Sequence, residues 1–326
     1  MRLIVGVDLG GTTIVVGTLT EDGMAMHGLV DELTPVHLGP EGVVERMLAM
    51  IRESVDRTRA ELGAGVEIAG VGIGAPGPLD TQRGIVIIAP NLGWRDMPLR
   101  DRIGVATGFD ATLDNDANCA TLGEWWRGAA QGGRIVVGIT IGTGIGGGIV
   151  LDGQVFHGAS DVAAEIGHMT IDVTGRRCKC GNYGCLEAYA SGTAIAARTI
   201  EELEAGTPSS IRSLVGGDLS RVTAHTVYQA AHDGDALALE IVRDTARFLG
   251  AGIANVLNML NPEVVVVTGG VTKAGDRLFE PLRTEVARRA FKPAVAVCRI
   301  VTGGLPGVAG VYGAVASFKV QRWGRA

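Results

Sequence analysis

A histidine and three cysteines lie within one short stretch near the middle of the chain. His168 is followed by Cys178, Cys180 and Cys185, which are three of the five cysteines in the sequence. One imidazole nitrogen and three thiolates form a ligand set that a structural, tetrahedral zinc ion takes. The alternatives are a disulfide or buried thiols without a role. A disulfide is disfavoured, because the first residues lack the pattern of a secretory signal and cytosolic thiols stay reduced. We therefore predict a structural Zn²⁺ held by these four residues.

Two glutamates, Glu165 and Glu187, bracket the same stretch. If zinc holds one ring nitrogen of His168, the other nitrogen becomes a hydrogen-bond donor whose direction the metal fixes. Two carboxylates and one oriented imidazole suit the several hydroxyls of a sugar. Most glutamates, however, are only surface charges, so the residues alone leave this role open.

The order Glu165-x-Gly-His168 and then Cys178-x-Cys180-Gly-x-x-Gly-Cys185-x-Glu187 resembles the ROK family of sugar kinases and sugar-responsive repressors. The resemblance implies that the histidine and the cysteines hold zinc, and that both glutamates and the same histidine bind the sugar. Further motifs extend it from about residue 2 to residue 318. It implies ATP, Mg²⁺ and a hexose as ligands, and a homodimer or homotetramer.

Two glycine-rich turns each follow an apolar strand. The first strand, Leu3 to Val7, leads into Asp8 and the turn Gly10-Gly11-Thr12-Thr13; the second leads into Gly142-Thr143-Gly144. Such turns can form a nest of backbone N–H groups for phosphate, although most Gly-Gly-Thr sequences are only turns. Asp8 is a candidate ligand for Mg²⁺ through water.

The two glycine-rich segments also resemble each other. Residues 4–10 and 136–142 align without a gap, with their apolar residues and glycines in step. This repeat indicates a duplicated α/β domain with a cleft between the halves, in which each half offers one phosphate turn. Asp8-x-Gly-Gly-Thr is also similar to the first phosphate motif of the actin and hexokinase-like superfamily. That motif often carries a nearby lysine, and here residues 13–16 contain none.

A run of carboxylates and amides precedes an expected helix near the middle of the first half. It reads Asp114-Asn115-Asp116-Ala117-Asn118, and one interpretation is a helix N-cap and nothing more. Phosphorylating a hydroxyl, however, requires a nearby acceptor for its proton. Asp116 is our candidate for this base, with Asn115 as a sugar ligand. The resemblance agrees, because ROK kinases use the aspartate of Asn-Asp-x-Asn as their base.

Three further glycine-containing turns complete the candidate site. Gly77, in Ala-Pro-Gly-Pro-Leu-Asp, and Asn91, in Ala-Pro-Asn-Leu-Gly-Trp, resemble bacterial members of the family on the sugar side. Asn91 alone could equally be an ordinary turn residue. Gly269-Gly270 follows an apolar strand and brings backbone close to a flat ligand. The resemblance assigns this turn to adenosine.

The remaining pattern supplies the elements that would position these residues. Helical spacing predicts a helix over 41–62, and Ala- and Leu-rich stretches predict helices over 191–205 and 226–257. Apolar runs predict strands over 14–19, 263–268 and 295–301, and the last expected helix, 307–318, returns to the first domain. We read Cys119 and Cys298 as buried thiols. The expected domains are 1–118 plus about 307–326, and 119–306 with the zinc site.

Composition excludes several classes of protein. Hydrophobic residues make up 46% and charged residues 20%, which permits a sizeable core. A net charge of −6 gives no general attraction for DNA or anionic membranes, and no apolar run is long enough to span a bilayer. We predict a cytoplasmic enzyme with no nucleic-acid or membrane partner. A sugar-sensing repressor is disfavoured, because the first strand begins at Leu3 and leaves no room for a DNA-binding domain.

The resulting prediction is an α/β protein of duplicated actin/hexokinase-like (ribonuclease H-like) domains with a zinc-stapled loop. It phosphorylates the 6-hydroxyl of a hexose with ATP, and glucose is the favoured substrate. The alternatives are a kinase for mannose, fructose or an N-acetylated hexosamine, and a sugar-sensing regulator without catalysis. Polyphosphate as the donor also stays open, because both turns would recognise phosphate through the backbone.

Overall fold

The computed structural model describes residues 1–326 and divides them into two compact units. The first comprises Met1–Gly138, Gly148–Ala164 and Gly303–Ala326, and the second comprises Ile139–Gly147 and Glu165–Thr302. The predicted boundary between residues 118 and 119 falls inside α3 (Asp116–Arg127), which belongs to the first unit. The domain division expected from the sequence stays a prediction.

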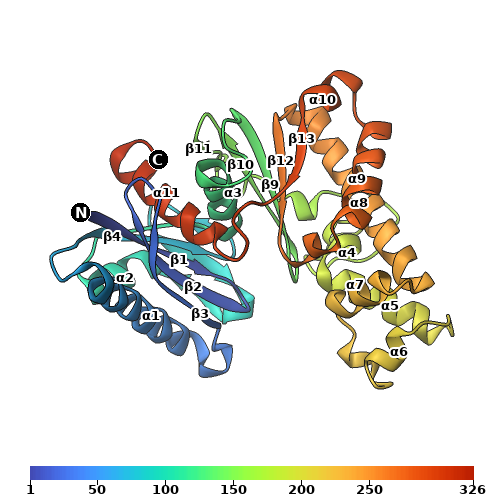
Figure 1. The fold of residues 1–326 in the computed structure, drawn as a ribbon, viewed down its shortest axis with the longest axis horizontal. Helices are drawn as coiled ribbons and strands as arrows, with labels where there is room; N and C mark the ends of the chain where they lie inside the picture. The colour runs from blue at the N-terminus through green and yellow to red at the C-terminus, as the bar shows by residue number, and fades with distance from the viewer. The chain divides into compact units, whose positions relative to one another are not determined.

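The first unit is built on a five-stranded mixed sheet in the order β3-β2-β1-β4-β8 (Figure 1). The strands are β1 (Arg2–Leu9), β2 (Thr13–Thr20), β3 (Met26–Leu33), β4 (Glu67–Ala75) and β8 (Ala111–Asn115). β1 to β3 are antiparallel, whereas β4 and β8 run parallel to β1. The parallel strands therefore end at the same edge of the sheet, where Asp8 and Asn115 lie.

Helices cover both faces of this sheet. α1 (Gly39–Leu62) packs on β2 and β3, and its buried side chains share a core with Val5, Val7 and Leu9 of β1. α11 (Ala309–Trp323) packs on β1, β4 and α3 from the other side. It comes very close to the sheet, because a Cβ on Gly72 would lie 2.0 Å from the Ala314 carbonyl oxygen. A side chain there would cost about 1–3 kcal/mol or more in overpacking.

Two smaller elements complete the first unit. A three-stranded sheet contains β5 (Leu79–Asp80), β6 (Ile85–Ala89) and β7 (Trp94–Met97), with the 3₁₀ helix η2 (Pro90–Leu92) between the last two. α2 (Leu99–Thr107) packs beside β8. These elements hold the turns that contain Gly77 and Asn91.

A second five-stranded sheet has the order β11-β10-β9-β12-β13. Its strands are β9 (Ile135–Ile141), β10 (Ile145–Leu151), β11 (Gln154–Val155), β12 (Val264–Thr268) and β13 (Arg299–Thr302). Each strand corresponds in chain order and sheet position to one of the first sheet. The predicted duplication is therefore visible in the topology.

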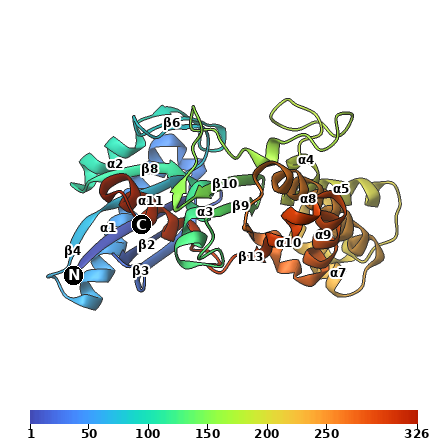
Figure 2. The same cartoon turned by 90° about the horizontal axis from the view of Figure 1, so that it is seen from above.

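The second unit is mostly helical beyond its strands. Its longer helices are α5 (Gly192–Glu204), α7 (Ala224–His232), α8 (Ala236–Leu260) and α9 (Asp276–Arg289), joined by the shorter α4 (Glu187–Ala190), α6 (Ile211–Leu214) and α10 (Lys292–Val297). Figure 2 shows α8, α9 and α10 side by side, and the three are in contact. None of the helices in the structure is both long enough and apolar enough to span a bilayer.

Most of the predicted elements are confirmed, and three expectations are wrong. The stretch 226–257 is not one helix: residues 233–235 separate α7 from α8, because Gly234 has φ +89° and the Asp235 side chain caps α8. The run 295–301 is not one strand: it contains the end of α10, and only β13 is extended. Pro293 stands at the second position of α10, where its fixed φ suits a helix start. Cys298 is half-buried and not fully buried, whereas Cys119 is completely buried. The C-terminal helix packs within the first unit, as expected.

Candidate functional site

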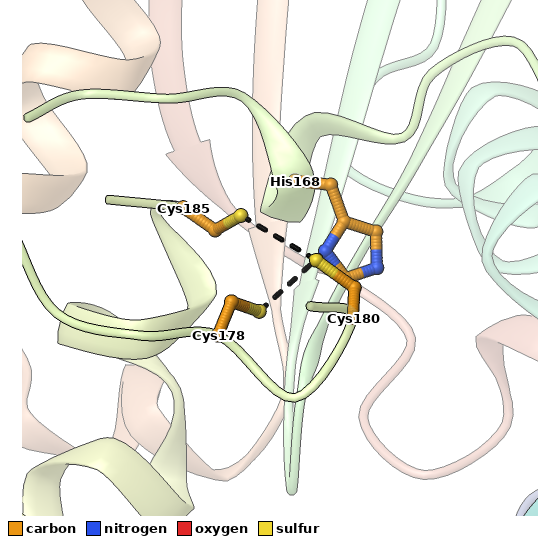
Figure 3. Close-up of side chains that lie close together, drawn as sticks. All are labelled: His168, Cys178, Cys180 and Cys185. Atoms are coloured by element: carbon orange, nitrogen blue, oxygen red, sulfur yellow. Dashed lines mark hydrogen bonds between the residues drawn. The ribbon is translucent and has the colours of Figure 1, made fainter. Parts of the chain in front are cut away.

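The four predicted zinc ligands converge in the second unit. Figure 3 shows His168, Cys178, Cys180 and Cys185 pointing toward one another, and their ligand atoms all lie within 4.8 Å of one another. Cys178 and Cys185 are buried, whereas Cys180 is exposed. Sequence-local contacts make this convergence possible: Gly184 has φ +72°, and a Cβ there would lie 1.6 Å from the Asp172 carbonyl oxygen. Only glycine fits this turn.

The spacing of the cluster fits a tetrahedral zinc ion. Zn–S bonds of about 2.3 Å place two sulfurs roughly 3.8 Å apart. The Cys180 and Cys185 sulfurs lie 3.7 Å apart, and the Cys178 sulfur lies 3.9 Å from Nδ1 of His168. Nδ1 is therefore the nitrogen that faces the thiols. The other nitrogen, Nε2, lies 3.9 Å from a Glu165 carboxylate oxygen, so the cluster orients it toward the glutamate.

Glu187 connects the cysteine cluster to the second glycine turn. One of its oxygens, Oε2, accepts a hydrogen bond of 2.8 Å from the Ile145 backbone N–H, and Oε1 lies 3.9 Å from the Cys178 sulfur. Glu187 is the first residue of α4, and the sequence places it two residues after Cys185. Glu165, in contrast, is exposed. The sequence identified both residues but gave no sign of the bond to Ile145.

The second glycine turn follows β9 and is fixed by several backbone contacts. The Gly192 N–H donates to the Gly142 carbonyl at 2.8 Å, and the Thr193 hydroxyl donates to the Thr143 carbonyl at 2.8 Å. A Cβ on Gly144 would lie 2.4 Å from Oε2 of Glu187, so a larger residue at this position would displace the glutamate carboxylate.

The Gly269-Gly270 turn lies beside the end of the same strand. Gly269 has φ +97°, and a Cβ there would lie 2.2 Å from the Ile141 carbonyl oxygen. The predicted residues Thr143, Gly144, Gly269 and Gly270 are thus brought to one end of β9. Close approach of bare backbone at this end suits a phosphate or a flat ring.

The first glycine turn lies between β1 and β2 and is fixed in a similar way. Gly10 N–H donates to the Thr13 carbonyl at 2.8 Å, and the Thr34 hydroxyl donates to the Gly10 carbonyl at 2.8 Å. A Cβ on Gly11 would lie 3.6 Å from the Asn91 side chain. The predicted sugar ligand Asn91 is therefore a neighbour of the predicted phosphate turn.

Gly77 has a structural reason to be glycine. Its φ is +96°, and a Cβ would lie 2.1 Å from the Ile88 carbonyl oxygen. This contact ties the turn after β4 to β6, the strand that precedes Asn91. Gly77 thus supports the position of Asn91.

Asp8 lies at the end of β1 and has an unusual electrostatic environment. Part of its surface stays accessible, but the surrounding protein and the charge of Asp116 raise its pKa from 3.8 to about 7. Gly310, at the start of α11, makes room for it, because a Cβ there would lie 2.2 Å from the Asp8 carboxyl carbon. The structure therefore brings Asp8 and Asp116 close enough to influence each other. One carboxylate with solvent access suits Mg²⁺, which keeps several waters.

Asn115 and Asp116 begin α3. Asn115 is the N-cap, and its side-chain oxygen accepts from the N–H groups of Ala117 at 2.9 Å and Asn118 at 3.2 Å. Its amide N–H₂ remains available as a donor, because the cap uses only the side-chain oxygen. One oxygen of Asp116 accepts from the Ala117 N–H at 2.8 Å. The N-cap interpretation is confirmed, and it is compatible with the functional role of both residues, which stays a prediction.

The partner of Asp114, the residue directly before Asn115, could not be predicted from the sequence. Asp114 is buried, and both of its oxygens lie 3.0–3.1 Å from Nε2 of His157. The hydrogen bond to Asp114 raises the pKa of His157, and the charges of Asp114 and Asp161 add to this effect. The two residues are 43 positions apart, and no pattern of spacing links them.

The chain is similar in sequence and in structure to proteins of a known family. A family model described as "ROK family" matches residues 4–321. The chain is 38% identical to the glucokinase of Thermotoga maritima over 97% of both chains. It is 41% identical to the glucokinase of Halalkalibacterium halodurans, over 86% of this chain and 84% of that protein. A crystal structure of a ROK family glucokinase from Streptomyces griseus in complex with glucose and AMPPNP has a TM-score of 0.82 and 34% identity, and covers 96% of this chain and 98% of that one.

Proposed function

The chain belongs to the ROK family and is a hexose kinase. We propose that it transfers the γ-phosphoryl group of ATP to the 6-hydroxyl of glucose and releases ADP. The full-length similarity to glucokinases favours glucose over mannose, fructose and N-acetylated hexosamines.

The observation that carries the proposal is that Asp8, near the end of β1, and Asp116, directly after β8, lie at the same edge of the first sheet. A candidate base must be next to the reacting groups, and the charge of Asp116 reaches Asp8, the candidate for holding the metal. We assign Asp116 as the acceptor of the proton from the 6-hydroxyl. Its carboxylate takes the proton as the oxygen attacks phosphorus, so the charge formed on the nucleophile is neutralised.

The remaining polar side chains bind the sugar and orient it. Asn115 donates its free amide N–H to a sugar hydroxyl, and Asn91 does the same from the turn beside Gly11. In the second unit, Glu165 and Glu187 accept from sugar hydroxyls and Nε2 of His168 donates. The zinc, when bound, is structural: it keeps His168 in one orientation.

The nucleotide is assigned to the glycine turns. Backbone N–H groups of Gly10 to Thr13 and of Thr143 and Gly144 bind phosphate oxygens, and Gly269-Gly270 faces the adenosine. Asp8 would hold Mg²⁺, which would supply neutralisation of the phosphate charge. No lysine follows the first turn, so backbone donors supply the contacts from that strand.

The experiment that tests the proposal identifies the product. Purified protein is incubated with zinc, Mg-ATP and uniformly ¹³C-labelled glucose, and the product is analysed by ¹³C and ³¹P NMR. We expect glucose 6-phosphate, recognised by phosphorus coupling to carbon 6. Phosphate on carbon 1, or free phosphate with unchanged glucose, would overturn the assignment.

The assembly and location of the protein are also part of the proposal. We expect a cytoplasmic homodimer or homotetramer, as the family resemblance implies. Light scattering after gel filtration tests the assembly, and a monomeric mass would contradict it.

A further inference from the structure

His157 forms an ion pair with a carboxylate that lies directly before the proposed sugar ligand and base. Asp114 is the last residue but one of β8, and only 1% of it is exposed. Its next two residues are Asn115 and Asp116. The orientation of Asp114 therefore sets the point from which the chain enters α3.

Donors from three other parts of the first unit converge on Asp114. Ser317 of α11 donates its hydroxyl to Oδ2 at 2.9 Å, and Asn118 of α3 donates its amide to Oδ1 at 3.3 Å. The Asn115 N–H donates to the same Oδ1 at 2.8 Å. His157, from the segment after β11, reaches both oxygens. Among these donors only the imidazole can carry a charge.

A buried carboxylate with a charged partner is held more strongly than one with neutral donors only. Leaving such a carboxylate without its cation is costly, and the group then shifts to recover solvent or a proton. Any shift of Asp114 moves Asn115 directly, because the two residues are bonded and share the hydrogen bond to Oδ1. Asp116, one residue further, moves with them.

We propose that His157 is a positioning residue of the kinase: its protonated imidazole holds Asp114 and thereby aligns Asn115 and Asp116 for phosphoryl transfer. This inference rests on the roles proposed above for Asn115 and Asp116. His157 does not touch the substrate in this account. Its contribution disappears when the imidazole loses its proton.

The direction of the pH dependence follows from the surroundings of the imidazole. Asp114 of β8 and Asp161 of its own segment face it and raise its pKa above the usual 6.5, whereas burial opposes them. Asp161 is itself held by the N–H and hydroxyl of Thr81. Burial raises the pKa of the Cys119 thiol well above its usual value, and the charges of Asp114, Asp8 and Asp116 add to this effect, so that thiol stays neutral. The ion pair is therefore complete at low pH and is lost as the pH rises through the raised pKa of His157.

The test compares kcat of the wild type with that of His157→Gln from pH 6 to pH 9, with glucose and Mg-ATP saturating. Glutamine keeps a neutral donor but no charge. We expect a wild-type to variant ratio of about tenfold near pH 6.5 that falls below about threefold at pH 9, with a smaller change in KM for glucose. Taking the ratio cancels titrations that both proteins share, such as those of the base and of ATP.

Two control variants and one rescue variant separate positioning from general destabilisation. His27→Gln breaks another histidine–carboxylate pair of the same unit, because Nδ1 of His27 lies 2.9 Å from an oxygen of the exposed Glu61. It should leave kcat unchanged at every pH. Ser317→Ala removes a neutral donor to Asp114 and should lower kcat by the same factor across the range. His157→Lys, which keeps a cation, should recover part of the activity and retain it at pH 9.

An NMR titration provides a readout that does not depend on activity. The His157 imidazole signal, assigned by its absence in His157→Gln, should titrate above pH 6.5 in the wild type and at lower pH in Asp114→Asn. If the wild type phosphorylates glucose but its ratio to His157→Gln is flat with pH, or if Asp114→Asn leaves the titration unchanged, the inference is wrong. If the wild type fails to phosphorylate glucose while the titration shifts as expected, the proposed substrate fails and the ion pair stands.

Discussion

The carboxylate of Glu187 accepts a hydrogen bond of 2.8 Å from the Ile145 backbone N–H. This bond joins the helix that follows the cysteine cluster to the turn that follows β9. A direct hydrogen bond therefore links the segment of the cysteine cluster to the proposed phosphate turn of the second unit. A substitution that displaces one of these two segments should therefore also displace the other.

Gly144→Ala tests this connection. The new Cβ would lie 2.4 Å from the Glu187 oxygen, so the glutamate must move and its bond to Ile145 is lost. A hydrogen bond to a charged group contributes about 1.5–3 kcal/mol, and we expect KM for Mg-ATP to rise by about 10- to 100-fold.

Gly142→Ala is the matched control for that substitution. It lies in the same turn, but a Cβ there meets no atom within 4 Å. Steady-state kinetics should show Gly142→Ala within about threefold of the wild type. Equal effects of the two alanines would mean that the turn is sensitive for a reason other than Glu187.

Asp116→Asn should separate sugar binding from catalysis. Asparagine has the same shape but cannot accept the proton, and general-base catalysis contributes about 10²–10⁴-fold. We expect kcat to fall within that range, while calorimetry gives a glucose Kd within a few-fold of the wild type. Turnover close to wild type would show that another group takes the proton.

Cys180→Ser should release the metal. Cys180 is the exposed member of the cluster, and its loss leaves three ligands for a four-coordinate ion. Elemental analysis should give about one zinc per chain in the wild type and much less in the variant. Glucose affinity should weaken by about tenfold or more, because Nε2 of His168 loses its fixed direction.

Cys298→Ser controls for the loss of a thiol as such, since Cys298 lies outside the cluster and is half-buried. It should keep both zinc and glucose affinity. Unchanged glucose affinity in a zinc-free Cys180→Ser protein would exclude an orienting role for the metal.

Asp8→Asn should stabilise the protein at alkaline pH. The folded-state pKa of Asp8, about 7, is higher than the usual 3.8, so the folded state binds the proton more tightly than the unfolded state. This contribution is present below pH 3.8 and is lost as the pH rises to about 7. Three pKa units correspond to at most about 4 kcal/mol, and the partial solvent access of Asp8 makes the expected gain smaller.

Thermal unfolding without divalent ions provides the measurement for Asp8. Asp8→Asn should melt higher than the wild type at pH 8, and the difference should shrink at pH 5. Asp56→Asn, an exposed aspartate of α1, should change neither value. A lower melting temperature for Asp8→Asn at pH 8 would show that the native carboxylate is stabilised by its surroundings.

The parts of the site that the sequence predicts are those in which chemistry and spacing are local. The zinc ligands lie within 18 residues of one another, so the turns at Gly181 and Gly184 suffice to bring them together. The repeated strand and glycine pattern predicts the matching order of the two sheets. Both inferences need only short segments of chain.

Contacts between distant segments could not be predicted in this way. The Asp114–His157 pair depends on how the segment after β11 returns to β8, and Ser317 reaches Asp114 from 203 residues away. The prediction of a strand over 295–301 was wrong because its valines favour strands, whereas the proline near the start of α10 favours the beginning of a helix. Local preference does not reveal which residues tertiary packing brings together.

ADP release with Mg-ATP across a panel of hexoses is the most direct test of the proposed glucose kinase activity. The panel contains glucose, mannose, fructose and N-acetylglucosamine, with a blank without sugar, and each rate is measured for the zinc-loaded wild type and for Asp116→Asn. We predict rapid ADP release with glucose, slower release with the other hexoses, none in the blank, and a loss of about 10²-fold or more in the variant. A faster rate with another hexose would contradict glucose as the substrate, and equal rates in the two proteins would contradict Asp116 as the base.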